Sequence, residues 1–159
     1  MQKYALIDSQ NLKKSVETID KKIDYKRFRL WLERKYEISC AIMFFGFMES
    51  QEDHYAYLRK CGFDLVFRDI DKQLGRIKAN IDICLTIWVM DHLEEIEKAH
   101  LVTSDGDFYD LVERLKQDEK FGGVISPSST NKCSKLLKKS VGSRITYIPD
   151  VIGKFENRG

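Results

Sequence analysis

The sequence predicts an α/β protein in which helices cover both faces of a mainly parallel sheet. Short apolar runs of strand length alternate along the chain with amphipathic stretches of helical length, which is the pattern of repeated strand–helix–strand units. The run Cys40–Met48 is almost wholly apolar, as expected of a strand covered on both faces. No Gly/Ser-rich linker and no internal repeat interrupts the alternation, so we expect a single domain over residues 1–159.

The composition agrees with such a domain and excludes several classes of protein. The 159 residues are 43% hydrophobic and 33% charged, which is typical of a globular chain and not of a disordered one. With 27 basic and 25 acidic residues, the net charge is too small for a histone-like arm or a polybasic lipid binder.

The sequence also indicates where the protein resides. No stretch reaches the roughly 18 apolar residues of a membrane span. The apolar start Tyr4–Ile7 is shorter than the about 7–15 residues at the centre of a signal peptide. The four cysteines form no CxxC pair, which argues against a zinc ribbon. We therefore expect a cytoplasmic protein with free thiols and no membrane partner.

In the first half of the chain, each expected strand is an apolar or alternating run, and each expected helix has one apolar face. Asp24 is placed to cap the first of these helices, and Gly62 is placed to end the second. The strands are expected at Tyr4–Asp8, Cys40–Met48 and Phe63–Arg68, and the helices at Tyr25–Tyr36, Gln51–Cys61 and Ala79–Ile96.

The second half of the chain continues the alternation. An apolar run leads into Asp105, Gly106 and Asp107, and amphipathic segments follow it. The strands are expected at His100–Ser104, Gly123–Ser126 and Arg144–Ile148, and the helices at Phe108–Phe121 and Asn131–Ser140.

Aspartates close two of the expected strands, and a parallel sheet brings such positions to one edge. Asp8 ends the first strand, and Asp105 and Asp107 follow the fourth. Asp82 interrupts an apolar sequence early in a helix, where an anion is electrostatically favourable. Ligands of open α/β sheets bind at the carboxyl ends of the strands. If the first and fourth strands are neighbours, these carboxylates converge.

Converging carboxylates favour a bound cation. Two carboxylates about 5 Å apart repel by roughly 3 kcal/mol at an effective dielectric constant of about 20, so a cluster needs protonation or a cation. An all-oxygen site without a nearby histidine or thiol selects Mg²⁺ or Mn²⁺ over zinc. Each aspartate also has a structural interpretation, because Asp8 or Asp107 could cap a helix and Asp82 could be a first-turn charge.

At these residues the sequence resembles the NYN family, which is related to the PIN-domain nucleases. The opening motif of that family, a hydrophobic strand ending in Asp with Asn three positions later, is matched by Asp8 and Asn11. The middle motif, Lys followed four residues later by Asp at a helix start, is matched by Lys78 and Asp82. The third motif, Ser/Thr-x-Asp-x-Asp-Phe, is matched by the segment Thr103–Phe108.

The resemblance implies a three-layer, PIN-like α/β/α sandwich and a metal-dependent ribonuclease. The implied catalytic and metal-binding residues are Asp8, Asp82, Asp105 and Asp107, and the supporting residues are Asn11, Lys78 and Ser104. The chain departs from the family pattern at Ser9 and Ala79–Asn80, where Gly is common, and at 140–143, where an Asp often occurs. These departures concern the substrate range more than the chemistry.

A basic segment in the second half of the chain is the expected RNA contact. Lys132, Lys135 and Lys139 have the spacing of one face of the expected helix Asn131–Ser140. A hydroxyl-rich turn precedes that helix and offers backbone N–H groups to a phosphate. Such contacts position a nucleic-acid backbone and do not read bases. The alternative interpretation is a solvated basic face.

We therefore expect a Mg²⁺- or Mn²⁺-dependent endoribonuclease, in which water activated by the cation attacks the RNA phosphodiester in line. A non-catalytic RNA-binding or assembly module on the same fold is the main alternative. A phosphatase of the HAD type is disfavoured, because the segment Asp8–Gln10 lacks the second aspartate of that nucleophile motif. A homodimer is compatible with so small a domain, although no sequence feature demands one.

Overall fold

The computed structural model describes residues 1–46, 51–68 and 81–158. Lys78 and the expected helix start at Ala79 lie outside the described residues, as does the end of the expected strand Cys40–Met48.

Six strands form one sheet in which every paired strand is parallel to its neighbour. The strands are β1 (Gln2–Asp8), β2 (Cys40–Gly46), β3 (Phe63–Arg68), β4 (Ile96–Val102), β5 (Phe121–Ser126) and β6 (Ile145–Tyr147). Their order is β3-β2-β1-β4-β5-β6. The chain thus builds outward from β1 to β3 and then crosses to β4 on the other side of β1, so the order reverses between β1 and β4.

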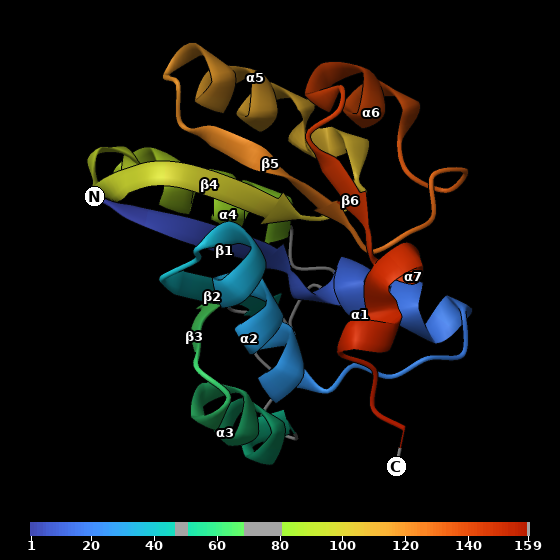
Figure 1. Cartoon of the computed structure of the whole chain (residues 1–159). Coiled ribbons are helices and arrows are strands. Elements are labelled where there is room, and N and C mark those ends of the chain that lie inside the picture. Colours follow the sequence, from blue (N-terminus) through green and yellow to red (C-terminus); the bar gives the residue numbers. More distant parts are fainter. Residues whose placement is uncertain (47–50, 69–80, 159) are drawn as a thin grey trace, which may run out of the picture.

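Helices cover both faces of this sheet, which confirms the predicted α/β class and the three-layer sandwich (Figure 1). The α-helices of the described residues are α1 (Ser9–Thr18), α2 (Tyr25–Tyr36), α3 (Glu52–Lys60), α4 (Ile81–Asp91), α5 (Tyr109–Gln117), α6 (Lys135–Val141) and α7 (Ile148–Val151). The 3₁₀-helices are η3 (Leu93–Glu95), η4 (Gly106–Phe108) and η5 (Ile152–Lys154). No helix among the described residues is long and apolar enough to cross a membrane, and the four cysteines are free thiols.

The side chains of β1 alternate between two hydrophobic cores, as the strand geometry requires. Tyr4 and Leu6 belong to the core beneath α4, α5 and α6. Ala5 and Ile7 belong to the core beneath α1, α2 and α7. Asp8 continues the series of Tyr4 and Leu6, which assigns it to the α4 side of the sheet.

The structure confirms the expected α2 and the end of α3. Asp24 caps α2, because its Oδ1 accepts a hydrogen bond from the Arg27 N–H at 3.1 Å. Gly62 follows α3 with a φ of +102°, a conformation that favours glycine.

The predicted helix Ala79–Ile96 is wrong at its C-terminal end. α4 stops at Asp91, and Ile96 already begins β4, four residues before the predicted strand start. The His92 ring stacks on Trp88 at 4.0 Å, and its Nδ1 lies 2.7 Å from the Trp88 carbonyl oxygen. The imidazole therefore hydrogen-bonds a backbone carbonyl at the C-terminus of α4, and the helix ends there.

The predicted helix Phe108–Phe121 is also too long. The helical segment consists of η4 followed by α5, and it ends at Gln117. Glu119 has a left-handed φ of +58°, so the chain turns there. β5 consequently begins at Phe121 and not at Gly123.

The predicted basic helix Asn131–Ser140 begins later than expected, at Lys135. Ser134 is its N-cap, because the Ser134 Oγ accepts a hydrogen bond from the Leu137 N–H at 3.3 Å. Lys132 lies in the preceding turn, so the predicted three-lysine helix face is wrong and only Lys135 and Lys139 share the helix. The N–H groups of Lys132 and Cys133 donate to the Ser129 carbonyl oxygen and are not offered to a ligand.

Two helices have no counterpart in the sequence prediction. α1 follows Asp8 directly, in agreement with the interpretation of Asp8 as a helix cap, but no helix was predicted over these residues, and its apolar face is formed by Leu12 and Val16. α7 begins at Ile148, where a strand was expected to end, and it has Pro149 in its first turn. Proline is tolerated there because the first N–H groups of a helix have no intrahelical partner.

Candidate active site

The candidate site lies at the carboxyl edge of the sheet, between β1 and β4. These strands are neighbours, with Ile7 paired to Val102, so the condition for converging aspartates is met. Asp8 is the last residue of β1, and Asp105 follows β4 after a short turn. This is the position where the strand order reverses, which is the usual ligand crevice of an open α/β sheet.

Asp8 is buried, with 8% of its surface exposed. Its Oδ1 accepts a hydrogen bond from the Asn11 N–H at 3.3 Å, and its Oδ2 accepts one from the Thr103 hydroxyl at 3.4 Å. Burial raises the pKa of Asp8 to about 6; the hydrogen bonds oppose this rise, and the charges of Asp105 and Asp82 add to it. The Asp8 carboxylate thus lies within electrostatic range of two other acidic side chains.

Asp8 and Asp105 also have structural roles. Asp8 caps α1, and Asp105 caps η4 by accepting a hydrogen bond from the Asp107 N–H at 2.9 Å. The cap of η4 is therefore Asp105, and the structural interpretation of Asp107 as a helix cap is wrong. The Asp107 residue is exposed. Asp82 lies in the first turn of α4.

Thr103 connects the two strand ends. Its hydroxyl donates to Asp8 and accepts a hydrogen bond from the Asp105 N–H at 3.2 Å. One buried hydroxyl group thereby fixes both carboxylate-bearing segments. Sequence reasoning included Thr103 in a motif but assigned it no role.

Asn11 and Ser104 form a second link across the site. The Asn11 Oδ1 accepts hydrogen bonds from the Ser104 N–H at 3.0 Å and from the Ser104 hydroxyl at 3.1 Å. The Ser104 Oγ lies 2.9 Å from the Ser128 Oγ, which lies 3.2 Å from the Ser15 Oγ. This chain of polar groups joins α1 to the turns after β4 and β5. Ser128 belongs to the hydroxyl-rich turn that was predicted to offer N–H groups to a phosphate, and Ser15 carried no recognisable signal in the sequence.

Gly106 permits a close approach between η4 and the start of α6. A Cβ atom at Gly106 would lie 2.4 Å from the Ser134 Oγ, which is inside the van der Waals distance. The Ser134 N–H donates to the Ser104 carbonyl oxygen at 3.2 Å. The glycine between Asp105 and Asp107 therefore allows the N-cap of α6 to pack against the acidic turn.

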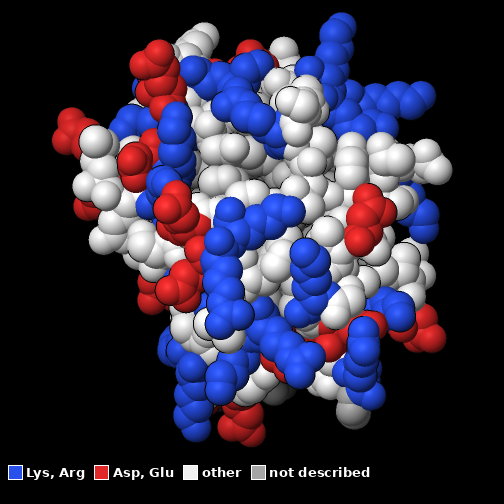
Figure 2. Space-filling view, in the orientation of Figure 1, with Lys and Arg blue, Asp and Glu red and all other residues white. Residues whose placement is uncertain are grey.

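The basic residues predicted to contact RNA are near this turn. α6, which carries Lys135 and Lys139, contacts η4. Figure 2 shows Lys and Arg side chains gathered at the α6 corner of the molecule. The Lys132, Lys135 and Lys139 residues are all exposed.

The donor chemistry fits a hard divalent cation. The acidic groups Asp8, Asp82 and Asp105 offer carboxylate oxygens, which Mg²⁺ and Mn²⁺ prefer. A cation would also offset the burial and the acidic charges that raise the pKa of Asp8. In the described ranges, no group of three or more His, Cys, Asp or Glu residues is close enough to be a preformed metal cluster.

Comparison with known proteins identifies one family. The NYN domain model matches residues 4–145. A crystal structure of a protein of unknown function from Vibrio parahaemolyticus is similar over 98% of this chain and 96% of that chain, with a TM-score of 0.77 and 23% sequence identity. At that identity the likeness concerns the fold alone.

A second solved structure is only weakly similar. Glycinamide ribonucleotide transformylase 1 from Symbiobacterium toebii covers 92% of this chain and 50% of its own, with a TM-score of 0.31 and 11% identity. That likeness carries no argument. No curated protein matches the sequence significantly.

Proposed function

The chain belongs to the NYN domain family, whose members are generally nucleases, and on that premise we propose that it is a Mg²⁺- or Mn²⁺-dependent endoribonuclease. The observation that carries the proposal is the position of Asp8, Asp82 and Asp105. Burial raises the pKa of the Asp8 carboxyl, the charges of the latter two add to this rise, and Asp8 lies at the point where the strand order reverses. Such an acidic crevice is suited to holding a cation against a phosphodiester.

In this proposal Asp8, Asp82, Asp105 and Asp107 would hold the metal, and the chemistry it would supply is neutralisation of phosphate charge and activation of water. The Thr103 hydroxyl fixes Asp8 relative to Asp105. The Asn11 amide holds the backbone of Ser104, directly before Asp105. Lys78, which lies outside the described residues, would neutralise the substrate phosphate as the family motif implies.

The RNA backbone of the substrate would follow the corner of the molecule at α6, where Lys and Arg side chains gather (Figure 2). Lys135 and Lys139 on α6, with Lys132 in the turn before it, supply positive charge beside the acidic turn. Contacts of this kind position the RNA without reading its sequence.

The test is cleavage of a mixture of single-stranded and structured RNA in Mn²⁺, in Mg²⁺ and in chelator. We expect cleavage in at least one of the two metals, none in chelator, and almost none from Asp82→Asn in any buffer. The matched control is Asp91→Asn, which removes an exposed carboxylate at the other end of the same helix and should cleave like wild type.

Two results would contradict the proposal. Cleavage that persists in chelator would exclude the metal mechanism. RNA binding without cleavage in either metal would favour the non-catalytic RNA-binding module.

A further inference from the structure

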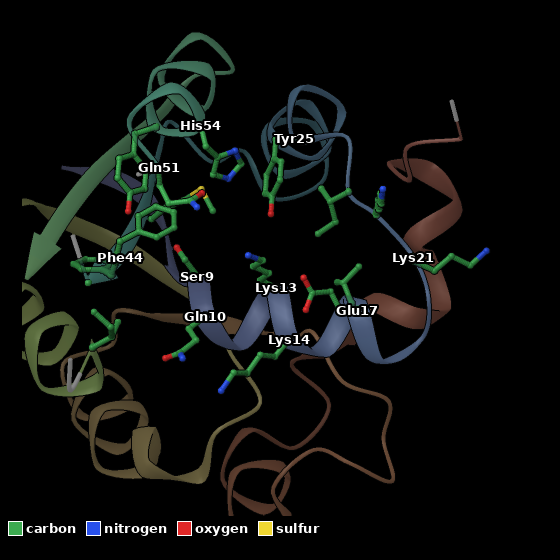
Figure 3. A pocket seen from close by; sticks show the side chains of 18 of the residues that line it. Ser9, Gln10, Lys13, Lys14, Glu17, Lys21, Tyr25, Phe44, Gln51 and His54 are labelled. Atoms are coloured by element: carbon green, nitrogen blue, oxygen red, sulfur yellow. The ribbon is translucent and has the colours of Figure 1, made fainter. Parts of the chain in front are cut away.

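A cavity of about 780 Å³ lies beside the candidate active site. It opens at the carboxyl end of β2, with α1 along one side and α2 and α3 opposite (Figure 3). The volume is within the range of small-molecule and cofactor sites, about 300–1,000 Å³. The charged groups and the aromatic rings that face this space decide what it can bind.

Positive charge predominates around the cavity. Its lining includes Lys13, Lys14, Lys21 and Lys22, against one acidic residue, Glu17. Figure 3 shows the Lys13 ammonium group directed from α1 into the cavity, whereas Lys14 and Lys21 are directed away from it. Lys21 forms an ion pair with Glu156 at 3.1 Å. Lys13 is therefore the cation best placed to meet an anion inside the cavity.

Aromatic rings form the opposite wall. The Tyr25 and His54 rings lie with centroids 6.0 Å apart in an edge-to-face arrangement, and both are directed toward α1 in Figure 3. Tyr25 is fixed from behind by Phe63, at 6.2 Å. Burial raises the pKa of Tyr25 to about 12, so its hydroxyl stays protonated and can donate a hydrogen bond.

Lys13 and His54 line the same cavity and lie within electrostatic range of each other. Desolvation, together with the nearby charge of Lys13, lowers the pKa of His54. The imidazole is therefore neutral at physiological pH and presents an uncharged ring face to the cavity. A neutral ring wall opposite a lysine suits a ligand with both a flat aromatic part and an anionic part.

The cavity borders the acidic site. Ser9 and Ile81 line it, and they are the chain neighbours of Asp8 and Asp82. Phe44, which pairs with Asp8 in the sheet, lines it as well. The aspartates are not among the lining residues, so a ligand in the cavity would lie next to a phosphodiester at the carboxylates and not on them.

We propose that this cavity binds one unpaired nucleotide of the substrate RNA next to the scissile phosphate, with the base against Tyr25 and His54 and an adjacent phosphate at Lys13. The identification of the ligand as RNA rests on the proposed function. The inference that the bound nucleotide is unpaired rests on the size of the cavity and on its aromatic wall. A base must leave its helix to enter a cavity between protein side chains, and stacking on aromatic rings is the usual means of holding such a base. The substrate class is then RNA with a single-stranded segment at the cleavage site.

The test measures binding in chelator, so that it does not depend on cleavage. The probes are a fluorescein-labelled single-stranded RNA of eight nucleotides and a blunt duplex of the same sequence. Wild type should bind the single strand at least about five-fold more tightly than the duplex. Removing the stacking on one base corresponds to about five-fold or more in Kd, and we expect that weakening from His54→Ala. Lys13→Ala should weaken binding and reduce the log–log salt slope by roughly 0.7.

Lys26→Ala is the matched control, because Lys26 is exposed on α2 beside Tyr25 and does not line the cavity. It should bind within two-fold of wild type. A measurement without any variant follows the ring protons of wild-type His54 by NMR. They should shift when the single strand is added, whereas those of His92, stacked on Trp88 at the far end of α4, should not.

Equal affinity for single strand and duplex would overturn the inference, and so would wild-type binding by both His54→Ala and Lys13→Ala. Neither result bears on metal-dependent cleavage. Conversely, selective binding through Lys13 and His54 without cleavage in either Mn²⁺ or Mg²⁺ would contradict the nuclease proposal and leave the nucleotide site in place.

Discussion

Asp8 is both a helix cap and a buried carboxylate, and these two roles have opposite effects on its pKa. Burial favours the neutral form, whereas the hydrogen bonds from the Asn11 N–H and the Thr103 hydroxyl favour the charged form. Burial and the neighbouring acidic charges prevail, so the folded-state pKa is about 6 compared with an ordinary value of 3.8. The metal-free protein therefore carries unfavourable charge at this position above pH 6.

The first prediction concerns Asp8→Asn in chelator. Between about pH 4 and pH 6 folded wild type binds more protons than unfolded wild type, so the stability due to neutral Asp8 is complete below about pH 4 and is lost as the pH rises through 6. Asparagine remains neutral and still caps a helix. The variant should therefore exceed wild type in unfolding free energy by about 2–3 kcal/mol at pH 7.5 and should match it near pH 4. Urea denaturation at both pH values measures this. A variant less stable than wild type at pH 7.5 would show that Asp8 is a structural cap and nothing more.

Sequence reasoning predicted that Asp8 and Asp105 lie at one edge of the sheet, because residues at the carboxyl ends of neighbouring parallel strands share an edge, and the pairing of β1 with β4 confirms that arrangement. It did not identify Ser128 and Ser15, whose hydroxyl groups extend the link from Ser104. These two serines are 113 residues apart in the chain and meet only through the sheet order. No local pattern of residue types predicts such a contact.

Among the elements, those with strong periodicity were predictable and those whose ends depend on single side chains were not. α2 was predicted with its boundaries, because Asp24 caps it and its apolar residues recur at helical spacing. The end of α4 depends on the His92 ring, and the start of α6 depends on the Ser134 hydroxyl. α1 has too narrow an apolar face to be predicted from periodicity, and the Asp8 cap and its packing against the sheet stabilise it.

The second prediction concerns the junction between η4 and α6. Gly106→Ala would place a Cβ atom 2.4 Å from the Ser134 Oγ and 3.1 Å from the Ser134 Cβ, so the cap of α6 must move. We expect a loss of about 1–3 kcal/mol in unfolding free energy, typical of overpacking, together with reduced cleavage. The control is Gly153→Ala, where the nearest atom would lie 3.9 Å away. Urea denaturation compares the two, and equal stability would mean that η4 and α6 move apart freely.

The third prediction concerns α6 as an RNA-binding element. Changing Lys135 and Lys139 to alanine should weaken single-stranded RNA binding at moderate salt. The log–log salt slope should fall by roughly 0.7 for each phosphate that a lysine no longer neutralises. The control changes the exposed Lys26 and Lys154 to alanine, which removes the same charge elsewhere. Its salt slope should stay higher than that of the Lys135 and Lys139 double variant. Equal slopes in the two double variants would mean that the basic face of α6 is solvated and does not contact RNA.

In the molecule as a whole, the sheet order assembles the site. β1 lies at the centre, and the crossing from β3 to β4 places the last residue of β1 beside the turn after β4. The alternation of strands and helices predicted the parallel sheet, but the sequence left the adjacency of β1 and β4 as a condition. The structure supplies that adjacency. It also supplies the cavity beside α1, which forms between the three consecutive helices α1, α2 and α3 and the carboxyl end of β2.

The measurement that tests the central claim most directly is thermal unfolding of wild type and Asp105→Asn, each in Mn²⁺ and in chelator. A ligand that binds only the folded state at a hundred times its Kd adds about 2.7 kcal/mol, which for a domain of this size corresponds to about 5–10 °C in Tm. We predict that Mn²⁺ raises the Tm of wild type by such an amount, that Asp105→Asn loses most of this increase, and that Asp91→Asn retains it. In chelator, Asp105→Asn should melt no lower than wild type, since it keeps a capping side chain and removes a repulsive charge. A wild-type Tm that does not respond to Mn²⁺, or an equal increase in Asp105→Asn, would contradict a metal site formed by these carboxylates.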